Sequence, residues 1–103
     1  MDQDEEFSTT LIRAGNEAAT FREMVEFAEM LEQRPVMKLL EDLPGLALLS
    51  EAKFNLATQI LRRRFRHETD ADRAQLITFA NEIADSAHTP EASERIRHIF
   101  ANA

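Results

Sequence analysis

The sequence contains no cysteine, tryptophan or tyrosine, and of its 103 residues only two are glycine and three are proline. Without cysteine there is no disulfide framework, no thiolate zinc site and no thiol nucleophile. Two glycines cannot form a glycine-rich loop for phosphate groups, and no Gly-x-Ser-x-Gly motif occurs. We therefore expect no enzymatic activity and no cofactor.

Targeting and membrane-spanning signals are also missing. No apolar run approaches the length of about 18 residues that indicates a transmembrane helix. The opening residues MDQDEEF are acidic, whereas a secretory signal begins with basic residues followed by an apolar stretch. We therefore expect a cytoplasmic protein that has no membrane contact.

Charge is abundant but unevenly distributed. The formal net charge is −7 and the pI is about 4.9. Residues 1–34 carry nine acidic and three basic side chains, whereas Arg62, Arg63, Arg64 and Arg66 lie within five positions. Net negative charge favours solubility and repels nucleic acid on average, although a local basic patch can still bind phosphates.

Apolar residues recur with helical spacing, and turn residues separate the segments. This pattern predicts one all-α domain, a compact bundle of four to five short helices with short loops. The predicted helices span about Glu17 to Gln33, Val36 to Leu43, Leu46 to His67, about Asp70 to Ala87, and Pro90 to Ala101. Residues 1–6 are predicted to be a disordered acidic tail and residues 7–103 a single helical domain, in which Phe7 to Ala14 could form a further short helix.

Proline and capping residues set most of these boundaries. Pro35 is expected to end the first long helix, and Pro44-Gly45 is expected to form a turn. Ser50 could cap a shorter version of the helix that begins at Leu46. Thr89 followed by Pro90 predicts the start of the last helix.

Residues 36–49 hold eight large apolar side chains among fourteen residues. We interpret this region as the centre of the core. An exposed apolar docking surface or a dimer interface is the competing interpretation.

The helix from Leu46 to His67 has two faces. Phe54, Ala57, Ile60, Leu61 and Phe65 share one face, and Asn55, Gln59, Arg62, Arg63 and Arg66 share the other. Arg64 falls within the apolar face. Two interpretations remain open: its guanidinium reaches water at the edge of the core, or it binds a carboxylate or phosphate of a partner.

The histidines His67, His88 and His98 do not form a metal-ligand pattern. Glu94 and His98 share a helix face, but no Glu-x-x-His pair of the kind used in di-iron bundles occurs. We therefore expect no metal site.

These observations favour a non-catalytic protein–protein interaction or regulatory module, such as an accessory, inhibitor or immunity-like small protein. Its partner would be another protein or a second copy in a homodimer. The predicted contact residues are the acidic helix face Glu23, Glu26 and Glu29 and the arginine-rich helix end Arg62, Arg63, Arg64 and Arg66. The alternative is a small helical subunit of a nucleoprotein complex, in which the arginine cluster, joined by Arg73, Arg95 and Arg97, contacts nucleic-acid phosphates.

Overall fold

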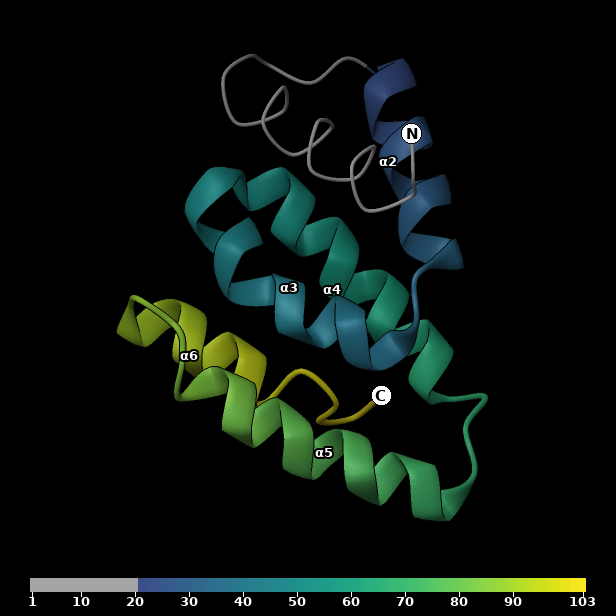
Figure 1. Ribbon diagram of the computed structural model, residues 1–103, viewed down its shortest axis with the longest axis vertical. Coiled ribbons are helices and arrows are strands. Elements are labelled where there is room, and N and C mark those ends of the chain that lie inside the picture. Colours follow the sequence, from purple (N-terminus) through teal and green to yellow (C-terminus); the bar gives the residue numbers. More distant parts are fainter. Residues whose placement is uncertain (1–20) are drawn as a thin grey trace.

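The computed structural model describes residues 21–103, and all regular structure in that range is helical (Figure 1). The helices are α2 (Phe21–Gln33), α3 (Val36–Leu49), α4 (Glu51–Phe65), α5 (Asp70–Ala84) and α6 (Pro90–Arg97). The all-α class is confirmed. The predicted acidic tail 1–6, the candidate helix 7–14 and the predicted start at Glu17 lie outside the described residues.

The central element is α3, which contacts α4, α5 and α6. In Figure 1, α3 and α4 run side by side in opposite directions, and α5 and α6 form a second helical hairpin. Four leucines of α3 are completely buried: Leu39, Leu40, Leu43 and Leu46. The prediction that this region forms the centre of the core is confirmed for these four side chains, although Met37, Leu48 and Leu49 remain exposed.

The predicted turn at Pro44-Gly45 is wrong, because α3 continues through both residues to Leu49. A proline inside a helix costs about 3 kcal/mol or more, since it removes a backbone hydrogen bond and clashes with the preceding turn. Burial of one leucine contributes about 1.5–3 kcal/mol. Leu43 and Leu46 flank Pro44 and are both buried, so their burial offsets this cost. The end of α3 turns away from the direction of its first half (Figure 1), as a proline kink would produce.

Side-chain caps begin three of the helices. Ser50, Thr69 and Thr89 each accept a hydrogen bond from the backbone N–H three residues further on, at 3.3, 3.2 and 3.1 Å. Such a cap satisfies an N–H that has no partner within the helix. The shorter version of α4, beginning at Glu51, is therefore the one that forms, and the predicted Thr89-Pro90 start is confirmed.

Three helices end earlier than the sequence predicted. The helices end at Phe65, Ala84 and Arg97, where the sequence predicted His67, Ala87 and Ala101. Beyond these ends the backbone forms hydrogen bonds that span three residues, as in a tighter turn than an α-helix. One example runs from the Ile99 N–H to the Ile96 carbonyl at 3.2 Å. Phe100 is nevertheless buried and stacks on Phe65, with ring centroids 4.3 Å apart. Apolar residues therefore continue beyond α6 because the final turn also packs on the core.

Candidate functional site

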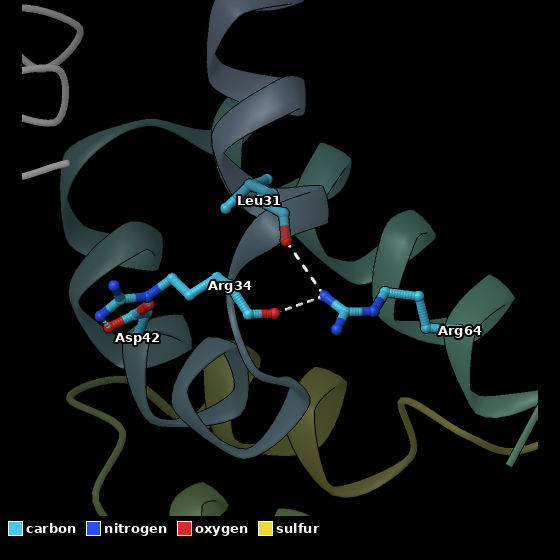
Figure 2. Close-up of polar contacts among 4 residues, drawn as sticks. All are labelled: Leu31, Arg34, Asp42 and Arg64. Carbon is cyan, nitrogen blue, oxygen red and sulfur yellow. Dashed lines mark hydrogen bonds and ion pairs between the residues drawn. The ribbon is translucent and has the colours of Figure 1, made fainter. Parts of the chain in front are cut away.

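Arg64 is directed at the end of α2. Its Nη1 donates to the carbonyl oxygens of Leu31 at 3.0 Å and Arg34 at 2.7 Å (Figure 2). The last carbonyls of a helix have no partner within the helix, and they carry the negative end of the helix dipole. Arg64 therefore joins α4 to the end of α2. This arrangement differs from both interpretations drawn from the sequence, because the guanidinium binds backbone oxygens of its own chain.

Partial burial changes the acidity of this guanidinium. Loss of solvation lowers the pKa of Arg64, the nearby Glu68 carboxylate opposes this shift, and Arg63 adds to it. An arginine pKa is high enough for the group to remain protonated at neutral pH. Arg64 therefore donates these hydrogen bonds as a cation across the physiological range.

An ion pair between Arg34 and Asp42 lies next to the Arg64 contacts. Arg34 Nε lies 2.5 Å from Asp42 Oδ2, and Arg34 Nη2 lies 3.2 Å from Asp42 Oδ1 (Figure 2). The two side chains are only 16% and 18% exposed. Because two parallel bonds from a guanidinium to a carboxylate fix direction as well as distance, this pair orients the link after α2 against α3. Arg34 thus binds Asp42 through its side chain and Arg64 through its carbonyl.

The other arginines of the cluster also have contacts within the chain. Arg62 Nη2 lies 3.4 and 3.5 Å from the carbonyl oxygens of Ala101 and Asn102, and Arg63 forms an ion pair with Glu32. Arg66 is exposed, and its carbonyl accepts a bond from Arg73 Nη2 at 2.7 Å. Three of the four predicted partner-binding arginines therefore make internal contacts through their side chains. Their role toward a partner stays a prediction.

The predicted acidic face lies on α2. Glu26 and Glu29 are exposed, and Glu26 accepts a bond from Arg22 Nε at 3.2 Å. Exposed pairs of this kind contribute about 0–1 kcal/mol to stability. The role of Glu23, Glu26 and Glu29 toward a partner stays a prediction.

Polar groups at the ends of α5 and α6 form two pairs, one between the helices and one within the end of α6. Arg97 Nη2 lies 3.1 Å from Asp85 Oδ1, and His98 Nε2 lies 3.2 Å from Glu94 Oε2. Over residues 21–103, no group of three or more histidine, aspartate or glutamate side chains is arranged to hold a metal ion. In the same range no helix combines the length and apolar character that a membrane span requires.

Lys53 is a buried cation that sequence reasoning missed. Its side chain is 1% exposed, and its Nζ lies 3.9 Å from the centroid of the Phe27 ring. An ammonium over an aromatic face is attracted to the electrons of the ring. Lys53 lies four residues before Ala57 and therefore shares the apolar face of the helix. This position was the signal in the sequence that could have predicted its burial.

An apolar groove between α3 and α5 was not predicted. Two adjoining hollows, of about 380 and 350 Å³, share Met37 and Gln75 in their linings. We call this pair the α3/α5 groove. Its apolar lining comes from Val36, Met37, Ala74, Leu76 and Phe79. Its charged lining comes from the acidic residues Glu68, Asp72 and Glu82 and from the basic residue Arg64. Sequence periodicity could not reveal the groove, because it forms only where two separate helices meet.

Comparison with models of protein families, with curated proteins and with solved structures gave no match in any of the three searches.

Proposed function

We propose that this chain is a non-catalytic protein-interaction module and that the α3/α5 groove is its principal contact surface. The observation that carries the proposal is Met37, a large apolar side chain that is 43% exposed and lines both hollows. An apolar side chain in this position loses unfavourable water contact when a partner covers it. The groove replaces the arginine-rich helix end as the favoured contact surface, because the arginines make several contacts within the chain.

The shape and charge of the groove favour one kind of partner. Elongated apolar grooves between helices commonly accept the apolar face of an amphipathic helix. Three acidic residues (Glu68, Asp72 and Glu82) and one basic residue (Arg64) are among the described residues that line this groove, so its net charge is negative. We infer that the partner segment is an amphipathic helix whose apolar face is flanked by lysine or arginine, since opposite charges across an interface favour association.

The nucleoprotein alternative has less support. Arg62 and Arg64 donate to backbone carbonyls, and Arg73 donates to the carbonyls of Phe65 and Arg66 at 3.2 and 2.7 Å. Arg97 faces the carboxylate of Asp85. These contacts spread the basic side chains over several helix ends, whereas a nucleic-acid interface gathers them on one face.

Substitutions that place a charge among the apolar lining residues of the groove test this proposal. The partner is first identified by affinity capture from the native host and mass spectrometry. The same partner is then measured against Met37→Glu and Ala74→Glu. Each substitution places a carboxylate on a surface that the partner must cover, so we expect at least about tenfold weaker binding, equivalent to about 1.4 kcal/mol.

Leu48→Glu is the matched control. Leu48 is 60% exposed and lies in the same helix as Met37, but it lines neither hollow. We expect this variant to bind the partner like the wild type, and circular dichroism should show unchanged helix content in all three variants. Equal binding by Met37→Glu and the wild type would exclude the groove. A solution mass of twice the chain mass that returns to the monomer value in Met37→Glu would identify a second copy as the occupant.

A further inference from the structure

A separate hollow of about 240 Å³ lies between α4 and the end of α6, and we call it the α4/α6 hollow. It is lined by Thr58, Arg62, Arg95, His98 and Ile99. The two arginines are 33 positions apart in the sequence and come from different helices, so only the fold brings them together. The volume is below the range of about 300–1,000 Å³ that is typical of pockets for drug-sized ligands. It suits a single ionic group.

Arg95 is held in place by two contacts with α4. Its guanidinium carbon lies 4.5 Å from the centroid of the Phe54 ring, and its Nη2 donates to Asn55 Oδ1. Phe54 itself is 1% exposed and belongs to the core. A guanidinium supported in this way loses less freedom when it binds an anion than one at the end of an unsupported side chain.

Arg62 is held more weakly on the other side. Its contacts with the carbonyls of Ala101 and Asn102 are long and use Nη2 alone. The bond from Arg95 to Asn55 likewise uses Nη2 alone. Each guanidinium carries five N–H donors. Within residues 21–103 the bonds of both arginines use Nη2, which leaves their Nε and Nη1 groups available to a ligand.

The charge of this hollow has one sign. None of the described residues that line it is acidic, whereas Glu68, Asp72 and Glu82 line the α3/α5 groove. Carboxylates lie outside this lining: Glu94 lies 3.2 Å from His98 Nε2, and Glu51 and Glu91 line a separate hollow of about 210 Å³ that shares Arg95. The hydroxyl of Thr58 donates to the Asn55 carbonyl at 2.7 Å. Its one donor is therefore already used, and Thr58 lines the hollow without donating to a ligand.

We propose that the α4/α6 hollow binds a phosphate dianion, either as the free ion or as the terminal group of a phosphate monoester. Two guanidiniums supply two positive charges and a set of N–H donors whose planar geometry matches phosphate oxygens. A phosphodiester carries one negative charge and fewer free oxygens, so it pairs less well with both arginines. This site lies apart from the α3/α5 groove, and its test is independent of the partner-binding proposal.

The test is an NMR titration of the intact chain at constant ionic strength and pH 7.5, in which the arginine side-chain Nε–H signals are followed. The probes are inorganic phosphate, phosphoserine and dimethyl phosphate. We expect saturable shifts of Arg62 and Arg95 with at least one of the first two, and about tenfold weaker binding of dimethyl phosphate. Binding of inorganic phosphate alone assigns the site to the free ion, and binding of phosphoserine extends it to monoesters.

Variants separate this site from general attraction of anions. Arg62→Gln and Arg95→Gln should each weaken phosphate binding about tenfold, because each removes a charged donor. Arg95→Lys keeps the cation over Phe54 but loses the planar fork, so its affinity should lie between those of the wild type and Arg95→Gln. Arg66→Gln is the matched control, since Arg66 lies on the same helix end but does not line the hollow. Non-saturating shifts, equal loss in Arg66→Gln, or equal binding of dimethyl phosphate would overturn the proposal.

Discussion

At the scale of single residues, three arginines in the described part of the chain act on backbone carbonyl groups. Arg64, Arg73 and Arg62 each contact two carbonyl oxygens, at the end of α2, at the end of α4 and in the turn after α6. The last four carbonyls of a helix have no partner within the helix, and a cation there also interacts favourably with the helix dipole. A dense arginine cluster can therefore serve the fold even where it looks like a binding surface.

Arg64→Ala should lower the free energy of unfolding by about 1.5–3 kcal/mol, which is typical of hydrogen bonds that involve a charged group. The loss leaves the carbonyls of Leu31 and Arg34 without this donor. Arg63→Ala is the matched control, because its ion pair with Glu32 is exposed and should contribute less than about 1 kcal/mol. Urea denaturation followed by circular dichroism measures both. Equal effects of the two substitutions would show that the Arg64 contacts do not stabilise the fold.

At the scale of elements, α3 shows that burial of apolar side chains can override a local turn signal. Pro44 and Gly45 form one of the strongest turn signals in the sequence, yet both lie within the helix. A Cβ added to Gly45 would have no atom of residues 21–103 within 4 Å, apart from its two chain neighbours and the backbone of its own helix. Nothing in the tertiary packing therefore requires glycine at this position.

Gly45→Ala should raise the free energy of unfolding by about 0.5–1 kcal/mol, because alanine loses less backbone freedom than glycine when it enters a helix. For a domain of this size, that gain raises the melting temperature by several degrees. The midpoint of thermal or urea unfolding provides the measurement. A loss of stability would indicate that the backbone at residue 45 has the turn conformation that the Pro-Gly pair suggested.

At the scale of the whole molecule, charge is separated into distinct surfaces. The α3/α5 groove combines apolar side chains with three carboxylates and one arginine, and the α4/α6 hollow combines two arginines with a histidine. The net charge of −7 therefore does not describe either surface. A partner would respond to the local potential, because charges separated by more than about 10 Å are largely screened at 0.1 M salt.

If a basic helix occupies the groove, its association should slow as the salt concentration rises, because salt screens the attraction between the carboxylates and the partner. Glu82→Lys should reduce the association rate and the dependence of that rate on salt. Glu91→Lys makes the same charge change at an exposed residue that does not line the groove, so its effect on the rate should be smaller. Surface plasmon resonance with the captured partner compares the two. Equal effects would mean that only the overall charge matters.

The sequence was sufficient for the helical class and for most of the helix starts. Caps such as Thr89-Pro90 act through hydrogen bonds over three residues, so the signal is local and readable. The buried leucines of residues 36–49 were likewise visible as a concentration of apolar side chains. The helix ends were predicted less well, because residues such as Phe100 are apolar without being helical.

Tertiary structure alone decided the continuity of α3 through Pro44, the destination of Arg64 and the two surface hollows. Each depends on atoms that are distant in the sequence: Arg64 binds carbonyls 30 and 33 residues away, and Arg62 and Arg95 line one hollow from two different helices. Periodicity assigns a side chain to a helix face, but it does not determine which element packs opposite that face. The sequence thus determined which segments are helical and where charge is concentrated, whereas packing decided which charges are used within the fold and which face solvent.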